Sequence, residues 1–382
     1  MERREFLGLA AMAGLGFAIP VRGSAATPRV LVSPIMLAQR RLVTLVAING
    51  AEPAPFAIDT GGSVSFINTD YARALRLDDR GLARMRGVGG IADLPVYLAK
   101  NVIIGAGLRQ EQVAFTGVSS FNGEIRGTLA AGVLTAMDSD LDIEKGEWRL
   151  YPDGRPSREG FVRMANGIVG IGLRQSARLY ADATVNGRKL RFLVDTGAPS
   201  GLSLHLATAR ALGLWDDSRP YSPLRNYGIA GETGLARVVR TDMLEFGGRR
   251  FERPLVLLRQ DGVNKSEDGV IGLELIRRFN LSTDVRRKEL WVKPHPSGEG
   301  LSETYGMSGL WLDQKGSEIR IADVGTGSPA KAAGLKAGDR VVGTSFAALV
   351  RQLGGRPGDT VRLSVDRGGA AQAVSFVLAE YL

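Results

Sequence analysis

The sequence predicts a mainly β chain in which two similar domains follow one another and a small third domain comes last. Three observations support this fold class: blocks of sequence that recur in one order, strand-like alternation of apolar residues, and glycine- and proline-rich stretches between blocks. With 382 residues, the chain is long enough for two or three domains that each have a core. Its 44% apolar and 23% charged residues are typical of a globular protein.

The N-terminus, residues 1–26, predicts an export signal. A charged opening precedes an apolar run, residues 7–19, and Pro20 and a cluster of small residues follow it. The run is shorter than the roughly 20 residues that span a bilayer, so we expect cleavage near Ala26 and no transmembrane segment afterwards. RREFL, residues 3–7, resembles the twin-arginine signal of bacteria. We therefore expect a periplasmic or otherwise exported protein.

Two stretches, residues 42–63 and residues 179–200, show the same order of features. Each has a strand-like run, an Asn-Gly pair, a second strand-like run and then Asp-Thr-Gly. Asn and Gly both accept the positive φ of a tight two-residue turn. Each stretch therefore predicts a β-hairpin whose second strand leads into the Asp-Thr-Gly loop.

The similarity continues beyond these hairpins. An amphipathic helix, a glycine-rich loop, an apolar segment with glycine and a closing hairpin follow in both copies: residues 71–77, 86–90, 129–134 and 142–152, then residues 208–214, 227–231, 269–275 and 284–294. Matching blocks in one order indicate a duplicated domain. We place lobe 1 at residues 27–152 and lobe 2 at residues 153–296.

The last part of the chain, residues 301–382, differs from both copies. Two late stretches, GDTVRLSVDRGG and QAVSFVL, alternate with period two, as paired strands do. The preceding residues, 293–303, contain two prolines and two glycines and read as a linker. The sequence therefore predicts a small separate domain at this end.

The residue inventory excludes several kinds of chemistry. The chain has no cysteine, and its two histidines, His205 and His295, do not form a pair with ligand spacing. Thiolate zinc sites, a cysteine nucleophile and a Ser-His-Asp triad are not expected, and we predict no metal and no cofactor. The net charge is +9, but the positive residues are scattered. We therefore expect no nucleic-acid partner.

Asp59 and Asp195 are the candidate catalytic residues. Each follows an apolar strand, so its carboxylate is expected where buried walls meet a cleft. Two carboxylates within about 3 Å cannot both ionise, and they share one proton. One can then act as general base on a water while the protonated partner binds a carbonyl oxygen, without a metal or a covalent intermediate.

The neighbouring residues suit this task. Gly61 and Gly197 let the backbone approach a carboxylate closely. The hydroxyls of Thr60 and Thr196 are expected to lock the two loops together. Ser63 is expected to hydrogen-bond the outer oxygen of the first aspartate.

The two copies resemble the retropepsin and pepsin type of aspartic peptidase. The resemblance rests on AIDTG with AAG, residues 130–132, and on LVDTG with VIG, residues 270–272. It implies two pseudo-symmetric lobes, a catalytic aspartate pair, a hydrogen-bonded grip between the threonines and a polypeptide substrate. It also implies flap hairpins over the substrate. The candidate flap and substrate-binding residues are Gly87, Gly89, Gly90, Tyr227, Gly228 and Gly231.

The chain departs from the family pattern at two places. Pro199 stands where the family usually has serine or threonine, with Ser200 one step later. In the first copy only Ala130 and Ala131 precede the glycine of the apolar segment. Both departures predict weaker catalytic competence than the family pattern implies, although neither removes an aspartate.

The tail segment GSPAKAAGLKAGDRVV, residues 327–342, resembles a bacterial PDZ domain. The resemblance places a carboxylate-binding loop at Gly309, Leu310, Trp311 and Leu312, and it implies capture of a peptide C-terminus there.

These features together predict an exported aspartic endopeptidase with a PDZ domain. Two alternatives stay open at this point. The lobes could be a catalytically weak scaffold that holds peptides, with the PDZ domain as the working part. Alternatively, each lobe could pair with its twin on another chain, although the long segment of residues 152–176 permits pairing within one chain.

Overall fold

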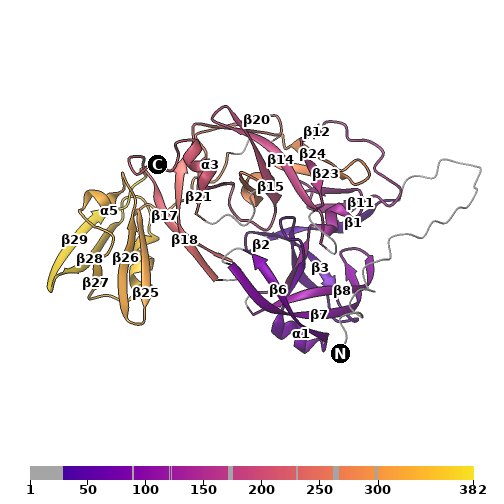
Figure 1. Cartoon of the computed structure of the whole chain (residues 1–382), viewed down its shortest axis with the longest axis horizontal. Coiled ribbons are helices and arrows are strands. Elements are labelled where there is room, and N and C mark those ends of the chain that lie inside the picture. Colours follow the sequence, from indigo (N-terminus) through magenta and orange to yellow (C-terminus); the bar gives the residue numbers. More distant parts are fainter. Residues whose placement is uncertain are drawn as a thin grey trace, which may run out of the picture.

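The computed structural model describes residues 29–87, 90–119, 121, 123–170, 175–228, 231–260, 266–296 and 300–382. Two β-rich lobes lie against each other, and the third domain lies beside lobe 2 (Figure 1). The predicted fold class, mainly β with two pseudo-symmetric lobes, is confirmed. The predicted export signal, residues 1–26, lies outside the described residues. Within the described ranges, no helix is both long and apolar enough to span a membrane.

Lobe 1 is a mixed sheet with two short helices. Its strand order is β2-β3-β4-β9-β5-β8-β7-β6. The elements are β2 (Met36–Ala38), β3 (Arg41–Ala47), β4 (Ala54–Asp59), β5 (Ser65–Asn68), α1 (Thr69–Ala74), β6 (Asp78–Gly87), β7 (Gly90–Ile104), β8 (Leu108–Val118), β9 (Gly127–Ala130) and α2 (Gly132–Thr135). Helix α1 lies where the amphipathic pattern predicts one, and the side chain of Asn68 caps its N-terminus.

Lobe 2 repeats this arrangement. Its strand order is β17-β18-β21-β16-β22-β15-β14-β19-β20, and β13 also pairs with β14. The elements are β13 (Gly167–Val169), β14 (Arg178–Val185), β15 (Arg188–Asp195), β16 (Leu202–His205), α3 (Leu206–Ala211), β17 (Ser222–Gly228), β18 (Gly231–Arg240), β19 (Met243–Phe246), β20 (Arg249–Glu252), β21 (Leu255–Arg259), β22 (Gly269–Gly272) and α4 (Leu273–Ile276).

The two predicted Asn-Gly hairpins are present at equivalent places. Asn49 and Gly50 have φ of 54° and 76°, and Asn186 and Gly187 have φ of 49° and 77°. These values suit a turn that matches the right-handed twist of the flanking strands. The turns fix the register of β3 with β4 and of β14 with β15, and both second strands end on an aspartate.

A third sheet joins the lobes. Its order is β1-β11-β10-β23-β24-β12, from β1 (Leu31–Pro34), β10 (Ser139–Asp142), β11 (Glu147–Leu150), β12 (Val162–Arg163), β23 (Phe279–Asp284) and β24 (Glu289–Pro294). Leu141 of lobe 1 pairs with Leu281 of lobe 2 at the join. One core runs through both lobes, with Trp148, Phe56 and Phe279 fully buried in it. The lobes therefore pair within one chain, and the alternative of pairing between chains is not needed to bring the two halves together.

The third domain is an antiparallel sheet with two helices and its own core. Its strand order is β25-β26-β27-β28-β29. The elements are β25 (Leu310–Lys315), β26 (Glu318–Val324), α5 (Pro329–Ala332), β27 (Arg340–Val342), α6 (Phe346–Leu353), β28 (Thr360–Arg367) and β29 (Ala370–Val377). Ser328 and Ser345 cap α5 and α6 by accepting backbone N–H groups.

The third domain docks on strand β17 of lobe 2 through polar contacts. The Tyr221 hydroxyl donates to Asp323 at 3.0 Å, and the Tyr221 N–H donates to the carbonyl of Thr326 at 3.2 Å. Tyr221 directly precedes β17, and on β17 itself Arg225 forms an ion pair with Asp313 of β25 at 2.7 Å. The segment predicted as a linker is also tied to lobe 2, since the Ser302 N–H donates to Glu274 at 3.1 Å.

Loss of one of these contacts should loosen the docking. Burial and Asp323 raise the pKa of Tyr221 to about 12, so its hydroxyl stays a donor over the ordinary pH range. We expect Tyr221→Phe to lower stability by about 1 kcal/mol, seen as a lower unfolding temperature of the third domain in calorimetry. Tyr71→Phe, at a half-buried tyrosine beside Arg126 in lobe 1, is the matched control. An equal unfolding temperature of the third domain in the two variants would show that the Tyr221 hydroxyl does not stabilise the docking.

Candidate active site

The two predicted catalytic aspartates lie at the ends of equivalent strands. Asp59 ends β4, which runs parallel to β9, and Asp195 ends β15, which runs parallel to β22. The strand residues before each aspartate are buried, whereas both aspartates keep part of their surface open. The fold therefore brings two carboxylates to the floor of the space between the lobes.

The threonines after the aspartates bind each other's loops. Thr60 Oγ1 donates to the carbonyl of Val194 at 2.7 Å, and Thr196 Oγ1 donates to the carbonyl of Ile58 at 2.6 Å. Each threonine N–H donates to the other's Oγ1, at 3.1 and 3.0 Å. Both threonines are completely buried. This reciprocal network, the grip expected from the sequence, holds the two loops in one pseudo-twofold arrangement.

The glycines of the two loops face the opposite aspartates. A methyl group on Gly61 would collide with the carboxylate of Asp195. A methyl group on Gly197 would lie 2.5 Å from Asp59 Oδ1 and 3.0 Å from Asp195 Oδ1. Both carboxylates therefore converge on the same small volume, and only glycine fits beside them.

The two aspartates receive different numbers of backbone hydrogen bonds. Asp195 Oδ1 accepts from the N–H groups of Gly197 and Ala198, at 2.7 and 3.2 Å. Asp59 Oδ1 accepts from the N–H of Gly62 at 2.9 Å. Donors that point at a carboxylate stabilise its ionised form. Asp195 therefore has more backbone support for a negative charge than Asp59 has.

The surroundings of Asp59 favour its protonated form. Burial in the cleft floor and the charge of Asp195 raise the pKa of Asp59 to about 7, although the Gly62 N–H and the Arg41 guanidinium act against this rise. Asp195 also hydrogen-bonds the Asp59 side chain. Two carboxylates this close share a proton rather than both ionising.

Comparison with known proteins agrees with this geometry. A family model described as aspartyl protease matches residues 44–135 and residues 181–275, one match in each lobe. The chain therefore contains two repeated aspartyl-protease-like regions, one in each lobe. Among solved structures, it is similar to an aspartic proteinase from Irpex lacteus, with 13% identity and a TM-score of 0.45 over 70% of this chain and 98% of that chain. No curated protein matches the chain.

One side-chain contact that the sequence predicted is absent from the candidate active site. Ser63 was expected to hydrogen-bond Asp59, but no such bond exists between these two described residues. The Ser63 carbonyl accepts the N–H of Ser176 at 3.0 Å, while Gly62 supplies the donor to Asp59. Pro199, at the equivalent place of lobe 2, is exposed. Backbone N–H groups support both aspartates, so Pro199 removes no contact that lobe 1 has.

The apolar segment of lobe 1 is shifted from its predicted register by two residues. Asp59 lies opposite Ala130 of β9, and Asp195 lies opposite Gly272 of β22. Ala130, rather than Gly132, is therefore the equivalent of Gly272, so the predicted match of residues 130–132 to the family's glycine motif is wrong. The hydrogen-bonded register of β4 with β9 decides the equivalence, and it differs from the alignment that sequence similarity suggests. A methyl group on Gly272 would collide with the carbonyl of Ser200, so the shape of its loop makes glycine necessary in lobe 2.

The predicted flap residues lie on two hairpins, one in each lobe. Gly87 and Gly90 pair at the end of β6–β7, and Gly228 and Gly231 pair at the end of β17–β18. Tyr227 pairs with Glu232 just below the second end, whereas Gly89 lies outside the described residues. In the view of Figure 1 the two hairpins run toward each other. The structure therefore places the predicted flap residues at the end of one hairpin in each lobe.

The predicted carboxylate loop of the third domain begins β25. The N–H of Gly309 donates to the carbonyl of Gly306 at 3.1 Å, and the N–H of Leu310 donates to Ser308 Oγ at 3.2 Å. Trp311 and Leu312 pair with β26 across an irregular register. The N–H groups of Gly309 and Leu310, two of the four predicted loop residues, therefore already have hydrogen-bond partners in this segment.

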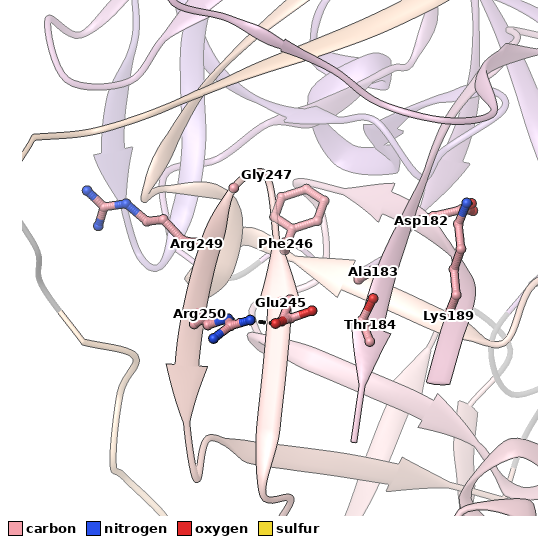
Figure 2. Close-up of a pocket in the computed structure, with 10 residues that line it drawn as sticks. Asp182, Ala183, Thr184, Lys189, Glu245, Phe246, Gly247, Arg249 and Arg250 are labelled. Carbon is pink, nitrogen blue, oxygen red and sulfur yellow. Dashed lines mark ion pairs between the residues drawn. The ribbon is translucent and has the colours of Figure 1, made fainter. Parts of the chain in front are cut away.

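A surface pocket of about 380 Å³ lies in lobe 2 away from the aspartates (Figure 2). Four of its charged residues form ion pairs: Lys189 with Asp182 at 3.0 Å and Arg250 with Glu245 at 2.7 Å. In the described ranges, no three His, Cys, Asp or Glu side chains converge as metal ligands would.

Sequence reasoning missed Arg41. This residue opens β3 in lobe 1, and its guanidinium donates to the carbonyl of Gly197 in the catalytic loop of lobe 2. The repeat offered one signal: Arg41 directly precedes the repeated block of lobe 1, as Arg178 precedes that of lobe 2. The contact joins residues far apart in sequence, so the pattern alone does not reveal the partner.

The threonine network can be tested with a nearly isosteric change. Thr196→Val leaves the carbonyl of Ile58 and the N–H of Thr60 buried without their partner, which should cost about 2–4 kcal/mol of unfolding free energy. Thr196→Ser keeps the hydroxyl and should lose about 1 kcal/mol or less. Urea unfolding measures both variants. An equal loss of unfolding free energy in Thr196→Val and Thr196→Ser would show that the hydroxyl does not support the loops.

Proposed function

We propose that the chain is an exported aspartic endopeptidase that hydrolyses peptide bonds. The observation that carries the proposal is the pair of half-buried carboxylates, which two reciprocally hydrogen-bonded loops hold together. The aspartyl protease family match in both lobes supports a peptidase.

The geometry suggests a division of labour between the carboxylates. Ionised Asp195, held by two N–H groups, acts as the general base that takes a proton from a water molecule. Protonated Asp59 donates a hydrogen bond to the carbonyl oxygen of the peptide bond and stabilises the developing oxyanion. The proton taken from water then passes to the leaving amine, which restores the singly protonated pair.

The symmetry of the lobes favours an internal peptide bond as substrate. Equivalent strands, loops and flap hairpins lie on both sides of the aspartate pair. Binding surface is therefore available on either side of the bond to be cut. A polypeptide that lies extended across the cleft satisfies this arrangement better than a short peptide held by one end.

The third domain is proposed to bind peptides near the active site. Strand β25 is the terminal strand of its sheet, and an extended peptide can add to such an edge. The resemblance to a bacterial PDZ domain supports a preference for peptide C-termini. Export rests on residues 1–26, whose twin-arginine-like sequence supports a place outside the cytoplasm.

Peptide cleavage by the mature chain tests the proposal directly. Asp59→Asn and Asp195→Asn should each lower kcat/KM on an unstructured protein substrate by about 10³-fold or more, because each removes one half of the acid–base pair. Asp70→Asn, at an exposed carboxylate of α1, should leave the activity unchanged. A pepstatin-type inhibitor should block the wild-type cleavage. Full activity in both dyad variants would exclude the mechanism, and peptide binding without cleavage by the wild type would favour the scaffold alternative.

The raised pKa of Asp59 also predicts how stability depends on pH. The folded chain keeps this proton up to about pH 7, while the unfolded chain releases it near the ordinary aspartate pKa of 3.8. The resulting stabilisation is full below about pH 4 and is lost as pH rises through 7.

Asp59→Asn removes this titration, so it should gain stability relative to the wild type between pH 4 and 8. The gain should be a few kcal/mol at most, since one pKa unit corresponds to about 1.4 kcal/mol. Thermal unfolding at a series of pH values measures it. A constant difference between the two proteins over this range would show that the Asp59 pKa is not raised.

A further inference from the structure

Arg41 reaches from lobe 1 to the catalytic loop of lobe 2. It follows the turn residues Gln39 and Arg40, whose φ of 51° and 59° reverse the chain between β2 and β3. This turn directs the half-buried guanidinium of Arg41 across the lobe boundary, where its Nη1 donates to the carbonyl of Gly197. The contact is separate from the threonine network, since none of the threonine atoms takes part in it.

The carbonyl that Arg41 binds belongs to the peptide group between Gly197 and Ala198. The N–H of this same peptide group donates to Asp195 Oδ1 at 3.2 Å. A cation at the carbonyl end orients and polarises the peptide group, which strengthens the hydrogen bond at its N–H end. Arg41 therefore acts on Asp195 through one peptide unit.

The charge of Arg41 also acts on Asp59, whose pKa it lowers against the larger effects of burial and Asp195. In the described part of the chain no carboxylate lies within ion-pair distance of Arg41. Glu274 of α4, whose N–H donates to the Ser200 carbonyl of the same loop at 3.2 Å, is engaged by Arg277 and Arg278 at 3.2 and 3.0 Å. Strand β9, which pairs with β4, and helix α2, which packs on β9, carry no charged residue. Among the described residues, Arg41 supplies a positive charge that acts on Asp59.

We propose that Arg41 is a positioning residue that holds the lobe-2 catalytic loop and supplies the positive charge that keeps the carboxylate pair singly ionised under acidic conditions. The proposal rests on the proposed peptidase function and deepens it. Without this charge, a buried pair of carboxylates takes up its second proton at a higher pH and loses its general base. Arg41 therefore sets the acidic end of the working range.

Lobe 2 repeats the residue but not the contact. Arg178 opens β14 as Arg41 opens β3, yet its Nε is buried without a hydrogen-bond partner among the described residues, and no bond joins it to the Gly61 carbonyl. The duplicated arginines thus serve the two loops unequally. This asymmetry agrees with the two N–H donors at Asp195 and the single donor at Asp59.

The test compares Arg41→Gln, Arg41→Lys and Arg40→Gln in the mature chain. Arg41→Gln keeps a donor for the carbonyl but removes the charge, so both limbs of the pH profile of kcat/KM should move up by about 0.5–1 pH unit. Arg41→Lys keeps the charge and should restore the wild-type limbs. Arg40→Gln removes an exposed neighbouring charge and should leave the profile unchanged.

A second readout does not depend on activity. The pH at which the stability difference between wild type and Asp59→Asn develops should move up by the same amount when both chains carry Arg41→Gln. The proposal would be overturned if Arg41→Gln changed neither the pH profile of kcat/KM nor the pH of the stability transition. It would also be overturned if Arg40→Gln shifted the pH profile as much as Arg41→Gln does. If the wild type cleaves no peptide, the peptidase proposal fails, while the stability transition still decides the role of Arg41.

Discussion

The reciprocal hydrogen bonding of Thr60 and Thr196 is the constraint on which the site depends. Each hydroxyl donates to the main chain of the opposite lobe, and each N–H donates to the opposite hydroxyl. All of these groups are buried, so a shift of one loop would leave polar groups without partners in both lobes. The network therefore holds two carboxylates closer than their mutual repulsion would otherwise allow. The shared sheet and the common core supply the rigid support behind it.

A duplicated chain need not produce two equal halves. Asp195 receives two backbone donors, and Arg41 binds the carbonyl of Gly197 in its loop, whereas Asp59 receives one donor. These contacts distinguish the two carboxylates without any change in the Asp-Thr-Gly motif. The third domain adds another inequality, because it docks on strand β17, which belongs to the flap hairpin of lobe 2.

The local parts of the fold could be predicted because they depend on local physics. The Asn-Gly pairs, the short helices and the duplicated strand-loop units follow from backbone preferences and apolar spacing. The register of β9 could not be predicted, because hydrogen bonds to β4 place Ala130 where the letters suggested Gly132. The contact of Arg41 and the engagement of Ser63 by Ser176 join distant segments, so they depend on tertiary packing that no short pattern encodes.

We propose that one chain forms one proton-sharing carboxylate pair. A titration of the mature chain with a tight-binding statine-type inhibitor near pH 5 tests this, with the mass of the complex determined in solution. We predict one inhibitor bound per monomeric chain and no binding to Asp195→Asn, since the inhibitor hydroxyl takes the place of the water between the carboxylates. One inhibitor bound per two chains, or equal binding to the variant, would contradict it.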